Sequence, residues 1–175
     1  MATSHIDLTT DLITVREYMH TSYHPDCDYV DGRIEERNLG EREHGELQAR
    51  IYFLLKRQRV LVPFLETRLR VSATRYRVPD VCAYQTKPTE SVFTEPPALC
   101  IEILSPEDRM NRIARVAQDY LSMGVPAVWL LDPLEKKAYV ADISAGFHEV
   151  RDHISTADGR VVFTLAEIFS EEDLF

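Results

Sequence analysis

Two carboxylates stand inside short apolar segments of this sequence, and their type and spacing point most directly to chemistry. Asp80 lies in the stretch 77–81, and Glu102 lies in the stretch 98–104. Both stretches are predicted to be short strands, because they are apolar runs bounded by turn-forming residues. A buried ionised carboxylate is costly unless it meets a cation, a metal ion or several hydrogen-bond donors. A bound divalent metal ion is the simplest explanation for two such acids on neighbouring strands.

Each carboxylate also has a purely structural interpretation. Asp80 follows a proline and could cap a turn, and Glu102 could form a salt bridge with Arg77 or Arg112. The metal hypothesis predicts that both acids lie on a common face of adjacent strands, within reach of one cation.

The composition predicts one soluble domain. The chain has 175 residues, of which 45% are hydrophobic, which suffices for one sizeable core and is too short for two ordinary domains. We expect no membrane segment, because no stretch of about eighteen apolar residues occurs, and we expect a cytoplasmic location, because no signal-peptide pattern is present. The net charge of -9 disfavours attachment of the whole surface to nucleic acid, although it leaves room for a local basic cleft.

The N-terminal part is predicted to form a short helix and a β-hairpin. Thr14 and Glu17 have the spacing of a capping box, which predicts a helix through about His20. The Asp31-Gly32 pair favours positive φ and marks a tight turn between two antiparallel strands.

Two long helices and a buried strand are expected to position the acids. Apolar residues recur at helical spacing in 44–59, and again in a helix that Ser105 is expected to cap and Gly124 to end. The apolar run 128–131 predicts a central strand covered on both faces. The strand–helix–strand order indicates an α/β fold with a mixed sheet. Further short elements are expected at 69–71, 137–143, 147–154 and 165–169.

Several segments, taken in this order and spacing, resemble the Uma2 family of the PD-(D/E)XK restriction-endonuclease-like superfamily. They are PDV at 79–81, IEILSPEDR at 101–109, YLSMGVPAVWLLDP at 120–133, YVDGRIEER at 29–37, and His44. The resemblance covers nearly the whole chain. It implies one restriction-endonuclease-like α/β domain over residues 1–175, with a mixed sheet flanked by two long helices and an N-terminal helix and hairpin.

The resemblance also implies an endonuclease that hydrolyses DNA phosphodiester bonds with Mg²⁺ or Mn²⁺. Such hydrolysis uses divalent cations that activate water and neutralise phosphate charge. DNA is the expected substrate, no membrane partner is expected, and a homodimer is left open. The implied site residues are Asp80 and Glu102 as catalytic metal ligands, Glu46 and His44 as further catalytic candidates, and Arg112 and Arg115 as phosphate-binding candidates.

The sequence lacks the positively charged side chain that the superfamily places at the site. The superfamily places a lysine two residues after the acid, where this chain has Leu104, and many Uma2-like sequences place the cation on the following helix, where it has Val116. Arginine cannot replace that lysine as a general base, because it stays protonated. The departure favours an alternative, a catalytically impaired nuclease-fold protein that acts as a binding or assembly partner. A third hypothesis is a metal-dependent hydrolase of a substrate other than DNA.

Other candidates have simple structural interpretations as well. His44 could be a surface or capping residue, and Glu46 could be a solvated helix residue. A group of arginines is either a phosphate-tracking stripe or a solvated strand face, with the second favoured. This group consists of Arg68, Arg70, Arg75 and Arg77.

Overall fold

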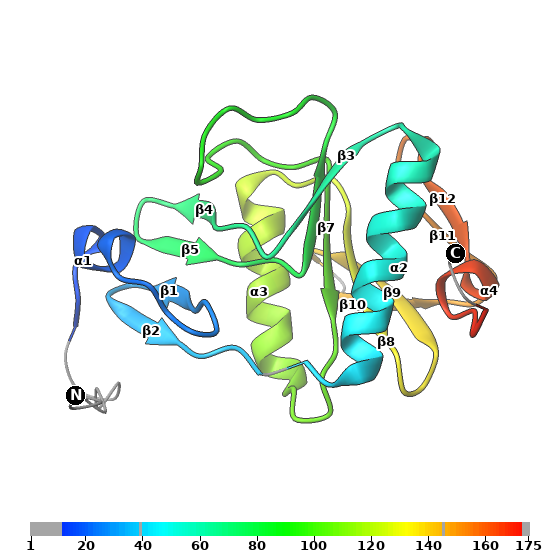
Figure 1. The fold of residues 1–175 in the computed structure, drawn as a ribbon, viewed down its shortest axis with the longest axis horizontal. Helices are drawn as coiled ribbons and strands as arrows, with labels where there is room; N and C mark the ends of the chain where they lie inside the picture. The colour runs from blue at the N-terminus through cyan, green and yellow to red at the C-terminus, as the bar shows by residue number, and fades with distance from the viewer. Residues whose placement is uncertain (1–11, 39, 145, 173–175) are drawn as a thin grey trace.

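A six-stranded mixed sheet forms the centre of the molecule, with a long helix on each face (Figure 1). The structure is a computed structural model that describes residues 12–38, 40–144 and 146–172. In spatial order the strands of this sheet are β10 (Gly146–Val150), β9 (Lys137–Asp142), β8 (Val128–Asp132), β7 (Leu99–Ile103), β6 (Val81–Tyr84) and β3 (Val62–Leu65). β7 and β8 run parallel, and the other neighbouring pairs are antiparallel. This is the mixed α/β arrangement that the sequence predicts.

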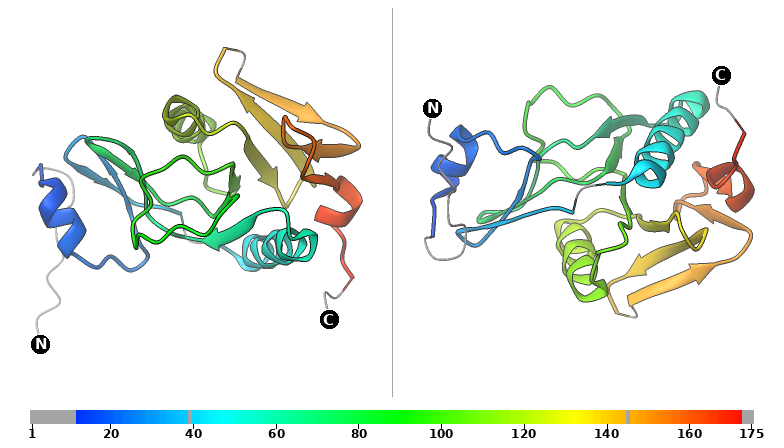
Figure 2. Two further views of the ribbon diagram at one scale, coloured as in Figure 1. Left: turned by 90° about the horizontal axis from the view of Figure 1, so that it is seen from above. Right: turned by 60° about the horizontal axis from the view of Figure 1, so that its bottom comes forward.

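Alternating side chains of β7 divide the core into two layers. Leu99 and Ile101 belong to the layer that contains the apolar residues of α2 (Arg42–Gln58). Cys100 points the other way and belongs to the layer that contains those of α3 (Met110–Met123). Figure 2 shows the two helices on opposite sides of the sheet. Because both faces are covered, the central strands read as continuous apolar runs.

A second, four-stranded antiparallel sheet carries the N-terminal part. In spatial order its strands are β2 (Arg33–Glu35), β1 (Asp28–Val30), β5 (Arg75–Arg77) and β4 (Leu69–Ser72). The helix α1 (Val15–His20) packs on it through a tyrosine cluster, in which the rings of Tyr18 and Tyr29 stack with centroids 5.1 Å apart. From β5 the chain runs through 78–80 into β6, so the two sheets are joined next to Asp80.

The C-terminal part adds a small two-stranded sheet and a short helix. These elements are β11 (His153–Ser155), β12 (Val162–Thr164) and α4 (Leu165–Ile168). Ile154 and Phe163 pack in the same cluster as Trp129 and Leu55, so this part closes the core on the α2 side.

Signals at the ends of elements are confirmed at three places. The capping box of α1 is present, since Thr14 Oγ1 accepts from Glu17 N while the Glu17 carboxylate accepts from Thr14 N. Asp31 and Gly32 have φ values of 50° and 92°, as the tight turn of the hairpin requires. Gly124 ends α3 with a φ of 104°.

The predicted start of the second long helix is wrong. α3 begins at Met110 with Arg109 as its N-cap residue, several residues after Ser105. The cause is local, because Asp108 Oδ2 accepts a hydrogen bond from Ser105 N at 2.8 Å, and Asp108 N donates to Ser105 O at 2.9 Å. This closed turn competes with helix formation. A loop over 104–109 therefore separates β7 from α3.

Three strand predictions also need correction. The strand expected over 77–81 is interrupted between β5 and β6, where Pro79 cannot donate a ladder hydrogen bond. β3 was not predicted, and its Pro63 is tolerated because β3 is the edge strand. The single strand expected over 147–154 is divided between β10 and β11, which belong to different sheets.

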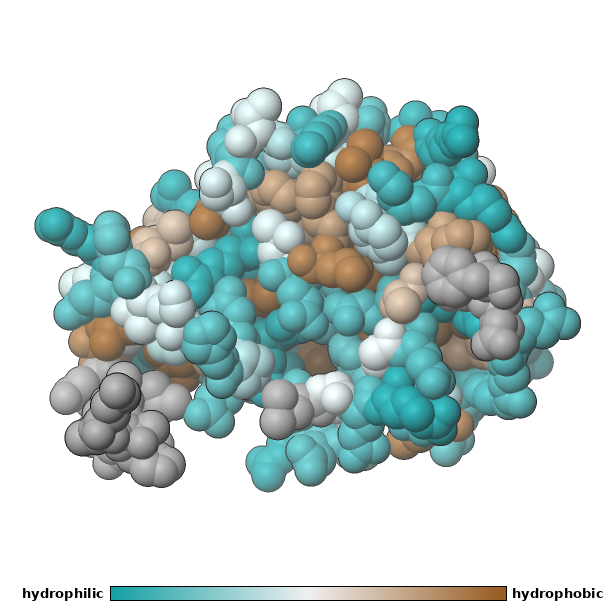
Figure 3. Space-filling view, viewed as in Figure 1, coloured by the Kyte–Doolittle hydropathy of each residue, from teal (hydrophilic) through white to brown (hydrophobic). Residues whose placement is uncertain are grey.

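The surface is largely hydrophilic, with apolar side chains gathered in small patches on the face that Figure 3 shows. Among the described residues, no helix is long and apolar enough to cross a membrane. The large apolar side chains that are exposed come from separate elements, and they are Leu12, Leu65, Met110, Leu134, Ile143 and Val162.

Candidate active site

Asp80 and Glu102 lie next to each other at one end of the central sheet. The β6–β7 register pairs Val81 with Ile101, so one further step along both strands sets Asp80 opposite Glu102. Asp80 Oδ2 accepts a hydrogen bond from the backbone N of Ile103 at 2.7 Å, which holds this carboxylate against β7. Asp80 is 3% exposed and Glu102 is 8% exposed. The chain thus brings together two carboxylates that are both nearly excluded from water.

Glu102 is a buried acid whose charge is only partly compensated. Burial is the main cause that raises its pKa, and the charge of Asp80 adds to it, so that the pKa of Glu102 rises to about 8. Arg37 and the hydroxyl of Tyr120 act in the opposite direction. Tyr120, on α3, donates to Glu102 Oε1 at 2.6 Å. The shift shows that the environment disfavours the ionised form of Glu102 when no metal ion is present.

Arg37 is the cation at Asp80, and sequence reasoning missed it. Its Nη2 lies 2.5 Å from Asp80 Oδ1, and its side chain is 12% exposed. Burial opposes the charge of Arg37, but Asp80 and Glu102 outweigh burial and raise the pKa of the guanidinium. The residue follows β2 in the link to α2, which runs past the first turn of α3 (Figure 1). This irregular link has no periodicity that would have singled Arg37 out.

The start of α2 presents His44 and Gln48 to Asp80. His44 Nε2 lies 3.3 Å from Asp80 Oδ2, and Gln48 Nε2 donates to the backbone carbonyl of Asp80 at 3.0 Å. Burial opposes protonation of His44, yet the hydrogen bond to Asp80 and the charge of Asp80 outweigh it and raise the pKa of His44. Glu46 lies between these two residues, points away, and pairs with Arg42 at 3.2 Å with its side chain 64% exposed. The structure therefore places His44 at Asp80 and leaves Glu46 outside the site, because residues one turn apart share a helix face.

The two arginines predicted to bind phosphate have different surroundings. Arg112 is partly buried, and its Nη2 lies 3.4 Å from Asp28 Oδ2 while its Nη1 lies 3.6 Å from Asp108 Oδ1. Arg115 is exposed on α3. Asp28, which pairs with Arg112, is also one of the charges that raise the pKa of Glu102. Of the two arginines, only Arg112 is linked to the acid pair in this indirect way.

The structural interpretation of Glu102 as the partner of Arg77 or Arg112 is not supported. Arg77 is buried, and its three guanidinium nitrogens bind the carboxylates of Asp28, Glu35 and Asp119 at 2.7–2.9 Å. Among the residues that the structure describes, neither arginine forms an ion pair with Glu102.

Most members of the arginine group at β4 and β5, with Arg68 just before β4, form ion pairs with carboxylates of the protein itself. Arg68 pairs with Asp26 at 2.6 Å and lies over the ring of Tyr18. Arg75 binds Asp31 and Asp119 at 2.6 and 2.9 Å. These contacts favour the structural interpretation of the group over a phosphate-tracking stripe.

The two expected lysine positions supply no charge. Val116 is 2% exposed in the apolar layer on the α3 side, together with Cys82, Cys100 and Tyr120. Leu104 follows β7 and is half-buried.

The pair fits a hard divalent cation. Mg²⁺ usually binds one or two carboxylates and keeps several waters, and a cation beside Glu102 would offset the burial that disfavours its charge. Within the described ranges, no three or more His, Cys, Asp or Glu side chains gather as a potential metal site, so this pair would need water to complete a coordination shell.

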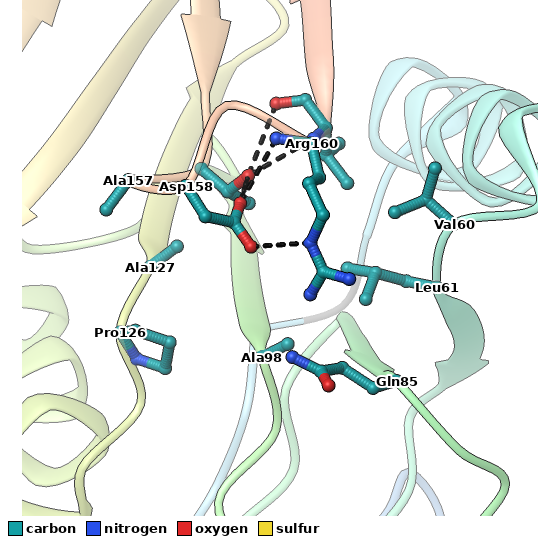
Figure 4. A pocket seen from close by; sticks show the side chains of 11 residues that line it. Val60, Leu61, Gln85, Ala98, Pro126, Ala127, Ala157, Asp158 and Arg160 are labelled. Carbon is teal, nitrogen blue, oxygen red and sulfur yellow. Dashed lines mark hydrogen bonds and ion pairs between the residues drawn. The ribbon is translucent and has the colours of Figure 1, made fainter.

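The described concave sites lie elsewhere. A pocket of about 130 Å³ is formed at the opposite end of β7 by Ala98, Ala127 and their neighbours (Figure 4), and the Arg160 and Asp158 side chains in its wall pair with each other at 2.7 Å. A groove of about 660 Å³ runs between α2 and α4, and Glu46 lines it. Asp80 and Glu102 line neither of these two.

Comparison with known proteins gives a family and a fold. The family model Uma2, described as "Putative restriction endonuclease", matches residues 16–153. No curated protein matches this chain. A crystal structure of a "putative nuclease belonging to DUF820" from Anabaena variabilis ATCC 29413 is similar with a TM-score of 0.78 at 21% identity. The match covers 90% of this chain and 98% of that one, so the fold of the two is shared over nearly their full lengths.

The matched region contains the acid pair and both elements that hold it, β6 and β7, together with α2 and α3. This chain therefore belongs to the Uma2 family and has the fold of that nuclease-like neighbour.

Proposed function

We propose that this chain is a divalent-metal-dependent endonuclease that hydrolyses DNA phosphodiester bonds. In the proposal the whole chain acts as one domain, with Asp80 and Glu102 as metal ligands and Mg²⁺ or Mn²⁺ as the ion. The observation that supports it most strongly is the pairing of these two buried carboxylates on adjacent strands, where burial and Asp80 raise the pKa of Glu102 to about 8. Perturbed acids of this kind are concentrated at functional sites.

The bound cation would supply an activated water and would neutralise charge on the scissile phosphate. The residues of the chain hold and orient the acids. Ile103 N and His44 bind Asp80 Oδ2, Gln48 holds the backbone of the same residue, and Tyr120 orients Glu102. We expect weak activity, because neither Leu104 nor Val116 supplies a base, and such groups typically contribute about a hundredfold to ten-thousandfold.

Arg112 is the proposed phosphate contact, since it pairs with Asp28, whose charge acts on Glu102, whereas Arg115 is exposed elsewhere on α3. A guanidinium can bind phosphate oxygens in a bidentate manner without changing its protonation. Because the overall charge of the chain is acidic, we expect DNA to contact only a local cationic region. Moderate salt should weaken this contact, because it screens the attraction between the arginine and the phosphate. No observation on the described residues supports the homodimer, which stays a prediction, as does the cytoplasmic location.

The direct test is nicking of supercoiled plasmid DNA by a molar excess of protein in Mg²⁺ or Mn²⁺. We expect slow, metal-dependent nicking by the wild type and none by Asp80→Asn. Glu149→Gln is the matched control, because it removes an exposed carboxylate from the edge strand β10 and should nick as the wild type does. Equal nicking by Asp80→Asn and the control would refute the assignment. A wild type that binds Mn²⁺ without any nicking would instead favour the impaired, binding-only alternative.

A further inference from the structure

Both oxygens of Asp80 are occupied by groups of the chain itself. Oδ2 accepts from Ile103 N at 2.7 Å and lies 3.3 Å from His44, and Oδ1 is bound by Arg37 at 2.5 Å. The side chains of Arg37 and Asp80 are 12% and 5% exposed, so this ion pair is largely excluded from water. A cation that approaches Oδ1 meets the positive charge of this guanidinium.

More than one acid stabilises the positive charge of Arg37. Asp80, Glu102, Asp28 and Glu66, in decreasing order, stabilise its positive charge against burial. The positions where a lysine was expected, Leu104 and Val116, carry no charge. Arg37 therefore supplies positive charge to the carboxylate pair, whereas the family pattern would supply it with a lysine at one of those two positions.

We propose that Arg37 is a resident counter-ion of the carboxylate pair and competes with a divalent cation for Asp80. This inference rests on the proposed function, because it assumes that Asp80 is a metal ligand. A divalent cation that binds Oδ1 has to move the guanidinium aside or bind against its positive charge.

The competition has two physical consequences. Without metal, Arg37 keeps the two acids assembled in a dry site, where an unpaired charge would be costly. With metal, the work of displacing Arg37 is subtracted from the binding energy, so the affinity of the wild type for divalent cations is lower than two buried carboxylates alone would give.

The test is calorimetric titration with Mn²⁺ alone. Arg37→Gln should bind Mn²⁺ about tenfold or more tightly than the wild type, because a unit charge close to the ligands is removed. Arg57→Gln is the matched control, because it makes the same change in net charge at the far end of α2, where the arginine is 58% exposed. It should bind as the wild type does. Arg37→Lys retains a positive charge and should not show the gain.

Thermal unfolding supplies a second readout. Arg37→Gln should melt below the wild type without metal and should gain more from Mn²⁺, since ligand binding to the folded state stabilises it. If Arg37→Gln is unfolded without metal, circular dichroism during the titration replaces calorimetry. Mn²⁺ should then restore the fold, and failure to restore it overturns the inference.

Asp80→Asn separates failure of this inference from failure of the proposed function. If Asp80→Asn binds Mn²⁺ as the wild type does, or if no variant binds Mn²⁺, the proposed metal site itself is wrong. If Asp80→Asn loses binding while Arg37→Gln binds no more tightly than Arg57→Gln, only the role of Arg37 is overturned.

Discussion

Two buried charge clusters meet on the segment that joins β5 to β6, and they are built differently. At Arg77, one guanidinium uses all three nitrogens to bind the carboxylates of Asp28, Glu35 and Asp119. In the second cluster, the two acids Asp80 and Glu102 lie side by side, and Arg37 binds directly to Asp80 only. The first cluster is a cation surrounded by acids, and the second is a pair of acids that share part of one cation.

The difference shows how charge of the same kind can serve structure or chemistry. A guanidinium whose three nitrogens all bind carboxylates has little capacity for a ligand, and its removal takes a shared partner from each of those carboxylates. A pair of acids in which one has a raised pKa can still gain from a cation. From this comparison we propose a role in folding for Arg77 and a role in metal binding for the acid pair.

The largest expected effect is on folding. Arg77→Met should lower the free energy of unfolding by about 3–5 kcal/mol, because it removes the buried cation that Asp28, Glu35 and Asp119 share. Urea unfolding measures the change. Arg57→Met is the control, since the exposed pair of Arg57 with Glu167 should contribute under about 1 kcal/mol. Similar losses of stability in the two variants would contradict the structural role that the comparison gives to Arg77.

Glu102→Gln should lower activity without lowering stability, which is the opposite of the effect expected for Arg77→Met. We expect metal-dependent nicking to fall on the order of a hundredfold or more, because the ligand charge is lost. The free energy of unfolding without metal should stay unchanged or rise, since an uncompensated buried charge is removed at nearly constant shape. Nicking and urea unfolding are measured on the same preparation, with Glu149→Gln as control. A large loss of stability without metal would point to a structural role for Glu102.

The pH dependence of stability should differ between the wild type and Glu102→Gln. The pKa of Glu102 is about 8 in the folded protein against an ordinary value of 4.5, so the folded state binds the proton more tightly. The contribution of Glu102 to stability is therefore most favourable below the ordinary value and is lost as the pH rises toward the folded pKa. The wild type should lose stability relative to Glu102→Gln across this window. A difference that stays constant from pH 5 to pH 8, taken as roughly the range between these two values, contradicts the shift.

The smallest expected effect is a gain from Val116→Lys. Tyr120 reaches Glu102 from one turn further along α3, so a lysine at position 116 shares its helix face and has the reach to approach the pair. Burial should lower the pKa of this lysine and let it act as a base. We expect about tenfold faster nicking at a cost in stability, because position 116 lies in an apolar layer. Nicking rates and urea unfolding of this variant and of Val116→Met, which keeps the position apolar, check both changes. Robust cleavage by the wild type that Arg112→Ala abolishes and Val116→Lys does not improve would show that the missing lysine is not the limitation.

The strand that holds Glu102 could be predicted from the sequence, because apolar runs and turn residues are local signals, whereas Asp80 lies just before β6 and not inside the strand expected over 77–81. Alternation along β7 predicts that Cys100 and Glu102 share a face, and the structure confirms that Cys100 packs opposite Leu99 and Ile101. The antiparallel register of β6 and β7 then sets Asp80 beside Glu102. Alternation is a property of neighbouring residues, whereas the register joins two strands that are separated by a loop.

The features that the sequence did not predict depend on contacts between distant segments. Arg37 comes to Asp80 from an irregular link, and nothing in its neighbourhood marks it as buried. Glu46 and His44 were equally placed by sequence, and only the rotation of α2 turns His44 toward Asp80. The late start of α3 is an exception, because it follows from the local turn between Ser105 and Asp108, although Asp108 also accepts from the distant Asn38 at 2.8 Å.

The most direct test of the comparison is the effect of Mn²⁺ on the melting temperature of three proteins, namely the wild type, Glu102→Gln and Glu35→Gln. Glu35 belongs to the Arg77 cluster and Glu102 to the acid pair, so the two variants make the same chemical change in the two clusters. Saturating Mn²⁺ should raise the melting temperature of the wild type and of Glu35→Gln, since binding to the folded state adds about 2.7 kcal/mol at a hundredfold excess over Kd. It should leave Glu102→Gln unchanged. A shift that persists in Glu102→Gln, or that disappears in Glu35→Gln, would contradict the assignment of metal binding to Asp80 and Glu102.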